Sequence, residues 1–291
     1  MGIHPLAVVH PTAVVDPSAD IGSECVVGPY SVIESDVTLG ERCQVSTHAV
    51  IKRGTILGTD NTIAEHCVIG GLAQHIQAKE FTGRVRIGSH NVIRETCTIH
   101  RPLRDGETVI GDHNFLMVGV HVAHDCNVGN HVIIANSTML AGHVTVEDRA
   151  FISGGVGIHQ FVRIGRQCMI GGTARIPKDV LPYVTIDGAS NFVVGLNTIG
   201  LRRGGMSSAD LLQLKKAYRI IYRSCLSWNE VLERLGQEFP EGPAAEFRRF
   251  CLGTKRGVIA ERRLPPGATI KLSVSDETED AGGSHTQAKA G

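Results

Sequence analysis

Residues 110–176 read IGDHNF LMVGVH VAHDCN VGNHVI IANSTM LAGHVT VEDRAF ISGGVG IHQFVR IGRQCM IGGTAR I when divided into groups of six. Every group opens with Ile, Leu or Val. The same spacing runs from Ile3 to Ile69 and again from Ile87 to Ile99. An amphipathic helix repeats every 3.6 residues and a half-buried strand every two, so neither produces a period of six. The period predicts a solenoid of stacked repeats.

A second column of small residues lies four positions after each aliphatic. Six of the eight cysteines fall in this column: Cys25, Cys43, Cys67, Cys97, Cys126 and Cys168. A narrow prism explains both columns, with a large aliphatic inside each face and a small residue near each corner. Three hexads would close one coil of 18 residues, and coils would stack at about the spacing of paired strands. We therefore expect these cysteines to fill the core, with no disulfide or metal role.

The hexads resemble those of the bacterial hexapeptide-repeat transferases. The resemblance implies a left-handed parallel β-helix of about nine coils and a homotrimer with sites between neighbouring prisms. The left hand is taken from the resemblance, because crossovers between parallel strands are usually right-handed.

Composition excludes several classes of protein. Lys+Arg and Asp+Glu both number 29, which argues against a general nucleic-acid binder and a polybasic membrane anchor. The sequence contains no long apolar run, and its first residues include several charged and histidine side chains. We expect a cytoplasmic protein without membrane insertion.

Two segments break the hexad register and are predicted to be surface loops: Gly71 to Arg84 and Arg101 to Thr108. The predicted β-helix domain spans residues 1–190, and a helical domain spans 191–263. Ser207 with Asp210, and Ser227 with Glu230, are expected to start helices. The last stretch, 264–291, is predicted to be a disordered tail because it is rich in polar residues, Pro and Gly.

The helical domain carries a surplus of basic residues that the neutral total conceals. Between residues 202 and 263 there are 13 Lys/Arg and seven Asp/Glu. This is typical either of a solvated helical face or of a docking surface for an acidic partner.

The 18-residue period brings several histidines together. His124, Gly142 and Gln160 are spaced by 18, as are Asp125 and His143. The predicted patch, two or three coils tall, contains His121, His124, Asp125, Gly142, His143, His159 and Gln160.

Three interpretations of this patch remain open from spacing alone. A neutral His could act as general base, with a neighbouring carboxylate holding its tautomer and the Gly142 N–H stabilising an oxyanion. Three imidazoles could instead bind zinc and activate water, as in hexapeptide-repeat carbonic anhydrases. Finally, the histidines could form hydrogen bonds across a subunit seam without catalysing anything.

Local motifs resemble one family in particular, the UDP-N-acetylglucosamine O-acyltransferases that open lipid A biosynthesis. The likeness covers about residues 3–262. The motifs are Thr98-Ile99-His100-Arg101, His121-Val122-Ala123-His124-Asp125-Cys126, Leu140-Ala141-Gly142-His143-Val144, His159-Gln160-Phe161, Gly200-Leu201-Arg202-Arg203, Ala217-Tyr218 and Ile221-Tyr222-Arg223-Ser224.

The resemblance implies that a 3-hydroxyacyl group moves from acyl carrier protein to the 3-hydroxyl of UDP-N-acetylglucosamine. His124 would be the general base, Asp125 would orient it and the Gly142 N–H would stabilise the oxyanion. The implied substrate-binding residues are Gln74, His121, His143, His159, Gln160, Asn197 and Arg203. Gly172 falls where the family limits acyl length, and a glycine there would admit a longer chain. The resemblance implies no metal and no cofactor beyond the phosphopantetheine of the acidic carrier protein, which would dock on the basic helices.

The sequence departs from the family pattern in its substrate contacts. His75 and Gln77 replace an acid and a lysine of well-known members, Ile199 replaces a Glu, and Gly204 replaces a second Arg. These changes leave two acceptors open, the sugar nucleotide and its 3-amino analogue, which would give N-acylation. The sister N-acyltransferase is disfavoured because the hexads begin at Ile3. A zinc-dependent, carbonic anhydrase-like protein remains the alternative from another class.

Overall fold

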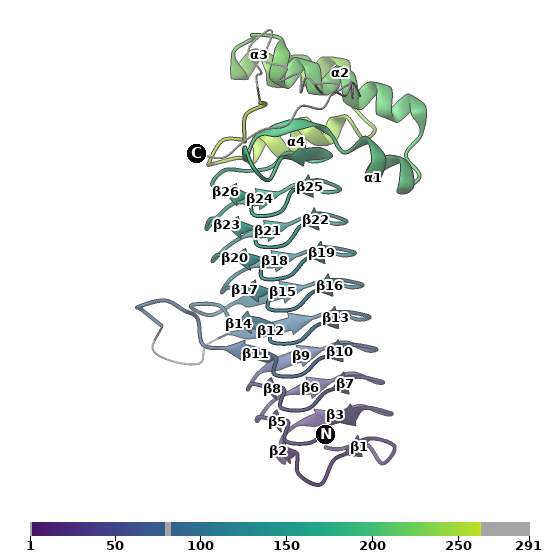
Figure 1. Cartoon of the computed structure of the whole chain (residues 1–291), viewed down its shortest axis with the longest axis vertical. Coiled ribbons are helices and arrows are strands. Elements are labelled where there is room, and N and C mark those ends of the chain that lie inside the picture. Colours follow the sequence, from purple (N-terminus) through teal and green to yellow (C-terminus); the bar gives the residue numbers. More distant parts are fainter. Residues whose placement is uncertain (1, 79–82, 263–291) are drawn as a thin grey trace, which may run out of the picture.

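The computed structural model describes residues 2–78 and 83–262, and its main body is a parallel β-helix (Figure 1). Short strands form three faces of a prism, and each strand pairs in parallel with the strand one coil further on. Val122 pairs with Leu140, and Leu140 pairs with Ile158, at the predicted spacing of 18 residues. The sequence prediction of stacked triangular coils is therefore confirmed.

The described residues form three sheets, here called faces A, B and C. Face A contains β3 (Asp20–Ile21), β6 (Thr38–Leu39), β9 (Thr55–Leu57), β12 (Arg84–Ile87), β15 (Glu107–Ile110), β18 (Asn127–Val128), β21 (Thr145–Val146) and β24 (Arg163–Ile164). Face B contains β1 (Val8–Val9), β4 (Val26–Val27), β7 (Gln44–Val45), β10 (Thr62–Ile63), β13 (Val92–Ile93), β16 (Phe115–Leu116), β19 (Ile133–Ile134), β22 (Phe151–Ile152), β25 (Met169–Ile170), β27 (Val184–Ile186) and β28 (Val193–Leu196). Face C contains β2 (Val14–Val15), β5 (Val32–Ile33), β8 (Val50–Ile51), β11 (Val68–Gly71), β14 (Thr98–His100), β17 (His121–Val122), β20 (Met139–Leu140), β23 (Gly157–Ile158) and β26 (Arg175–Ile176).

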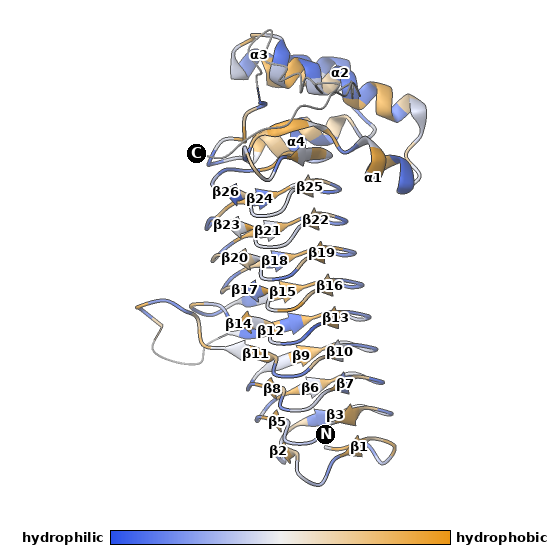
Figure 2. Ribbon diagram, in the orientation of Figure 1, coloured by the Kyte–Doolittle hydropathy of each residue, from blue (hydrophilic) through white to orange (hydrophobic). Residues whose placement is uncertain are grey.

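The prism interior is filled by the two columns seen in the sequence. From Ile21 onward the hexad aliphatics are buried, and the six cysteines of the small column are buried free thiols. Figure 2 shows hydrophobic residues recurring at the strands of each coil and hydrophilic residues at the turns between them. The predicted role of these cysteines as core filler is confirmed.

The β-helix extends beyond the last predicted hexad. Ile164 bridges to Val180 and Ile170 pairs with Ile186, at a spacing of 16 instead of 18. The sequence pattern faded here because this last coil is two residues shorter. The predicted domain boundary at residue 190 falls between β27 and β28, which pair antiparallel.

Both breaks in the register lie between strands of neighbouring coils and leave the stack. The first insertion connects β11 to β12 and the second connects β14 to β15. In Figure 1 they lie on the same side of the prism, near its middle. Arg101 at the start of the second insertion is buried, so this segment is not entirely a surface loop.

Up to residue 262, four helices follow the prism: α1 (Thr198–Arg203), α2 (Ser208–Arg223), α3 (Trp228–Glu238) and α4 (Ala245–Leu252). Ser207 caps α2 by accepting a hydrogen bond from the Asp210 N–H, and Ser227 and Glu230 form a capping box at α3. Both predicted helix starts are confirmed. The short α1 was not predicted from the sequence. The predicted tail, 264–291, lies outside the described residues.

Over the described ranges, the longest apolar stretch of helix is too short or too polar to cross a membrane.

Candidate active site

The central feature of the site is a His–Asp pair at the corner that follows β17. His124 Nδ1 lies 2.7 Å from Asp125 Oδ2, and the His124 side chain is largely buried. Since an ionised carboxylate only accepts, the hydrogen-bond network assigns the proton to Nδ1. This leaves Nε2 of a neutral His124 as an acceptor, as a general base requires.

The Asp125 carboxylate is itself held by the second insertion. The Leu103 N–H donates to Asp125 Oδ2 at 3.0 Å, and the Asp125 N–H donates to Thr108 Oγ1 at 2.9 Å. Asp125 occupies a left-handed turn position with φ of 60°, which Asp tolerates better than most residues. The second insertion thus holds both the carboxylate and the backbone of Asp125.

Gly142 lies directly against the His124 ring, one coil further on. A Cβ at this position would lie 2.5 Å from His124 Cε1 and 2.6 Å from Nε2, which is closer than van der Waals contact allows. The φ of Gly142 is not positive, so it is space and not backbone conformation that requires glycine. Its N–H makes no hydrogen bond within residues 2–78 and 83–262. The stack expected from the 18-residue spacing is present.

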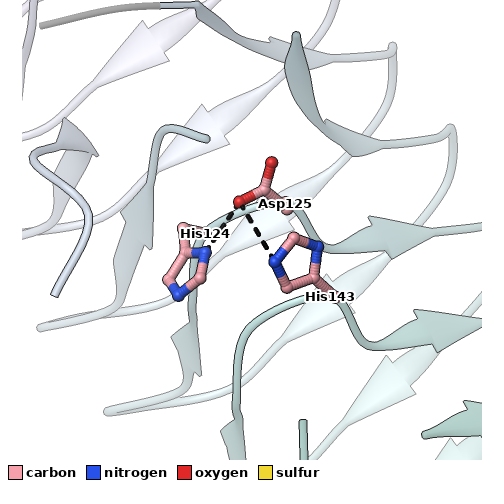
Figure 3. Close-up of side chains that lie close together, drawn as sticks. All are labelled: His124, Asp125 and His143. Atoms are coloured by element: carbon pink, nitrogen blue, oxygen red, sulfur yellow. Dashed lines mark hydrogen bonds and ion pairs between the residues drawn. The ribbon is translucent and has the colours of Figure 1, made fainter. Parts of the chain in front are cut away.

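His143 completes the group from the same coil as Gly142, as Figure 3 shows. Its ring meets the His124 ring edge to face at 5.2 Å, and its Nε2 lies 3.7 Å from Asp125 Oδ2. On its other side it stacks on Phe161 at 4.5 Å. Asp125 Oδ2 therefore faces both imidazoles, and it is closer to His124.

These three side chains also form a candidate metal-binding group. One ligand atom from each of His124, Asp125 and His143 lies within 4.8 Å of the others. However, Asp125 Oδ2 already accepts hydrogen bonds from His124 and from the Leu103 backbone. For a zinc ion to bind at about 2.0–2.2 Å from each ligand, His124 Nδ1 would have to lose its proton and its hydrogen bond to Asp125 Oδ2, and these two atoms would have to move apart. The donor set as arranged fits a hydrogen-bonded pair better than a metal.

The His124 ring opens into a cavity of about 500 Å³ along face C. Among the residues expected from the sequence, the cavity is lined by Gln74, His121, His124, Gly142, His159 and Gln160. His159 Nδ1 lies 3.2 Å from the Gln160 carbonyl oxygen. Asp125 and His143 are not part of the lining; they contact His124 instead.

Several lining residues were not identified from the sequence. Met139, Gly157 and Arg175 lie in one column with His121, each aligned with the next in the strand register. Adding 18 to His121 would have found all three. His75, which the sequence had placed among the substrate contacts, also lines the cavity, with its ring 5.8 Å from that of His124.

His121 and His100 form the inner wall of the site. His121 Nδ1 lies 2.7 Å from Thr98 Oγ1, and the rings of the two histidines meet edge to face at 5.0 Å. Burial, followed by the charges of His121 and His124, lowers the pKa of His100 to about 4. Burial also lowers the pKa of His121, with a smaller contribution from His124. Both histidines are consequently held neutral near pH 7.

Asn197 and Arg203 lie apart from this cavity within the chain. They line a second cavity of about 550 Å³ over face B, together with Phe151 and Met169. Asn197 Oδ1 accepts from the Gly200 N–H at 3.1 Å and so caps α1, while its amide donates to the Gln167 carbonyl.

Gly172 lies at the corner between faces B and C. A Cβ there would lie 3.4 Å from the Gly154 carbonyl oxygen. It does not line the face C cavity.

Comparisons with known proteins match both the β-helix and the C-terminal helices of this chain. The family model described as UDP N-acetylglucosamine O-acyltransferase, domain 2, matches residues 179–259, and the hexapeptide-repeat model matches 18–53 and 107–142. The acyl-[acyl-carrier-protein]–UDP-N-acetylglucosamine O-acyltransferase of Gloeothece citriformis is 44% identical over 201 residues, which are 69% of this chain and 72% of that protein. The chain belongs to the UDP-N-acetylglucosamine O-acyltransferase family.

Solved structures of the family agree. The UDP-N-acetylglucosamine acyltransferase of Bacteroides fragilis has a TM-score of 0.83 at 38% identity, covering 86% of this chain and 99% of its own. The enzyme of Acinetobacter baumannii also has a TM-score of 0.83, at 37% identity, covering 87% and 99%. These matches confirm the predicted family and the left-handed parallel β-helix with C-terminal helices.

Proposed function

We propose that this O-acyltransferase moves a 3-hydroxyacyl group from acyl carrier protein to the 3-hydroxyl of UDP-N-acetylglucosamine, the first step of lipid A biosynthesis. Family membership supports the reaction class. The single observation that supports the mechanism is the His124 ring, oriented by Asp125 and packed on the bare backbone of Gly142 at the edge of a cavity.

The proposed mechanism needs no covalent enzyme intermediate. His124 Nε2 takes the proton of the sugar 3-hydroxyl as that oxygen attacks the thioester carbon. The charge on the former carbonyl oxygen is stabilised by the Gly142 N–H, which makes no other hydrogen bond in the described part of the chain. Collapse of the tetrahedral intermediate breaks the carbon–sulfur bond, and His124 returns the proton to the departing thiolate. Asp125 stabilises the intervening imidazolium.

Four further residues of the cavity lining, together with His143 behind His124, would hold the two substrates. We assign Gln74, His121, His143, His159 and Gln160 to the sugar nucleotide and the acyl-phosphopantetheine arm. Gly172 would bound the acyl chain at the far edge of face C, where its missing side chain leaves room for a longer chain. The chemistry assigned here uses hydrogen bonds and proton transfer, so we propose no metal and no cofactor other than the phosphopantetheine of the donor.

We propose a homotrimer, because the two cavities lie on different faces of one chain. Asn197 and Arg203 on face B would complete the face C cavity of a neighbouring subunit. The acidic acyl carrier protein would dock on the basic helices beyond the prism, where Arg202 and Arg203 end α1. Eight free cysteines are typical of a reducing compartment, which supports a cytoplasmic location.

The test is an acyl-transfer assay with purified protein. 3-Hydroxyacyl carrier proteins of several lengths are paired with UDP-N-acetylglucosamine and with its 3-amino analogue. We expect ester product from the natural sugar nucleotide, and a preference among donor lengths that shifts to shorter chains in Gly172→Met. Transfer to neither acceptor at any donor length would contradict the proposed function, and exclusive transfer to the amino analogue would replace O-acylation with N-acylation.

A further inference from the structure

Arg101 is a buried cation that the proposed chemistry does not use. Only 2% of its surface is exposed, although arginine is rarely buried without specific partners. It stands at the start of the second insertion, immediately after His100 at the inner wall of the site. Its role must come from what its guanidinium contacts.

The guanidinium joins backbone carbonyls from both ends of the first insertion. Nε donates to the Gly70 carbonyl at 3.1 Å, and Nη1 donates to the Gly83 carbonyl at 3.4 Å. Nη2 donates to the Arg53 carbonyl, two coils before Arg101, and the Arg101 N–H donates to the Gly71 carbonyl at 2.9 Å. The planar fork of arginine can reach three separate acceptors at fixed angles, which the single nitrogen of lysine cannot do.

The packing around these carbonyls leaves the ends of the insertion little freedom. A Cβ on Gly71 would lie 3.0 Å from His100 Cδ2, and a Cβ on Gly83 would lie 2.3 Å from Pro102 Cγ. The residues on either side of Arg101 are thus packed against the same two ends that its side chain binds. Two residues beyond Arg101, the Leu103 N–H holds Asp125.

Between the clamped ends, the insertion carries Gln74 and His75 into the cavity. A tight turn fixes His75: its N–H donates to the Ala73 carbonyl, and its Nδ1 accepts from the Gln77 N–H at 3.1 Å. Its ring meets the His124 ring at 5.8 Å and 77°. Any shift of the clamped ends would therefore be transmitted to a side chain beside the His–Asp pair.

We infer that Arg101 is a positioning residue for the part of the site that binds the acyl acceptor, the sugar nucleotide. By binding both ends of the first insertion, it holds Gln74 and His75 where they contact that nucleotide. This inference rests on the proposed function for the identity of that ligand. The same segment, His100 to Leu103, therefore contacts both the first insertion and, through the Leu103 N–H, Asp125 of the His124–Asp125 pair.

The experiment measures the Kd of UDP-N-acetylglucosamine by titration calorimetry, which requires binding and no turnover. The variants are Arg101→Gln, Arg101→Lys, His75→Ala and the double variant Arg101→Gln/His75→Ala. The matched control is Arg42→Gln, which removes an exposed arginine paired with Asp60. Melting temperatures are recorded for every variant.

We expect Arg101→Gln to raise Kd about tenfold, because a displaced loop no longer presents its contacts, and Arg101→Lys to give an intermediate value. Arg42→Gln should stay within about twofold. In the His75→Ala background, Arg101→Gln should raise Kd by clearly less than about tenfold, because one of the two contacts through which it acts is already gone.

Two results would overturn the inference: an unchanged Kd in a folded Arg101 variant, or the same tenfold change with and without His75. A purely structural arginine would lower the melting temperature and leave the Kd of the folded protein unchanged. If Arg101→Gln fails to fold, Arg101→Lys with and without His75→Ala decides by the same criterion. Wild-type protein that binds the nucleotide without transferring an acyl group would instead contradict the proposed function alone.

Discussion

All three corners of the prism carry histidines, and the groups at two of these corners are arranged differently. At the corner between faces A and B, His90, His113 and His131 stack face to face, with ring centroids 4.7 and 4.8 Å apart and planes within 2° of parallel. At the corner between faces C and A, His124 meets His143 edge to face at 88° and pairs with a carboxylate. Composition alone does not distinguish the two groups.

The position within the coil distinguishes them. His90, His113 and His131 all have φ between 55° and 59°, so they occupy the left-handed turn position of each coil, where their exposed rings stack along the edge. At the other corner Asp125 occupies that position, and His124 comes one residue earlier, with its ring against the next coil. The regular repeat therefore stacks His90, His113 and His131, which we call the histidine ladder. Placing the histidine one residue earlier in the coil instead produces a His–Asp pair. The predictions below test that difference.

The largest effect is expected for His124→Ala. Removing a general base should lower kcat by roughly 100- to 10,000-fold, without an equal change in melting temperature. Initial rates of acyl transfer measure this. Near-wild-type activity in the variant would mean that His124 is not the general base. The His–Asp corner would then have no catalytic role that the stacked histidines lack.

Gly142→Ala should lower kcat by about 100-fold, because the added methyl would displace the His124 ring that it would otherwise overlap. The matched control is Gly157→Ala in the same cavity, where a Cβ meets nothing within 4 Å. We expect the control to lose less than about tenfold. Equal losses in the two variants would mean that the close approach to His124 is unimportant.

Asp125→Asn should lower kcat by roughly 10- to 100-fold, because a neutral amide no longer stabilises the imidazolium or holds its tautomer. In the histidine ladder, Asp60 Oδ2 lies 3.9 Å from His90 Nδ1, which is beyond hydrogen-bond distance, so the size of this loss measures what the close pairing contributes. The readout is kcat from initial rates, measured beside the wild type. An unchanged kcat would contradict the assigned role of Asp125.

Because His100 is buried beside the site, we expect the stability of the protein to depend on pH. His100 has an ordinary pKa of 6.5 when unfolded and about 4 when folded, because burial disfavours its charged form. Between these values the unfolded state binds more protons, so stability is lost as pH falls from about 6.5 to about 4. Melting temperatures over this range should fall less steeply in His100→Gln than in the wild type. Identical slopes would assign the acid sensitivity to other groups.

The smallest effect is expected for His113→Ala in the ladder. Its ring is exposed and stacked only on its neighbours, so kcat should stay within about twofold and stability within about 1 kcal/mol. Assay and thermal melt are run beside His124→Ala. A loss comparable to that of His124→Ala would show that placement in the coil does not separate the two groups.

Much of the fold followed from periodicity. The hexads predicted the faces, the core and the cysteine positions, and the 18-residue step brought His124 over Gly142. The shortened coil that ends at Ile186 lies within the predicted β-helix domain, but the hexad pattern did not locate its strands because it lacks the period. The helix α1 was missed because it has six residues and is capped by Asn197, a residue first considered for substrate binding.

The contacts made by the two insertions are the part of the site that the sequence did not predict. His75 contacts the His124 ring, the Leu103 N–H binds Asp125, and Arg101 binds the Gly70 carbonyl at one end of the first insertion. No repeat encodes these contacts, since each insertion leaves the stack and returns to it. Their placement depends on side-chain packing between two loops. Met139, Gly157 and Arg175, by contrast, were predictable from the same period applied to His121.

The most direct test of the central claim is a crystal structure with the acylated sugar nucleotide bound. The account predicts the product's 3-oxygen about 3 Å from His124 Nε2, with the acyl carbonyl oxygen facing the Gly142 N–H. A product bound with its 3-oxygen away from His124, at the histidine ladder or elsewhere on the prism, would contradict it.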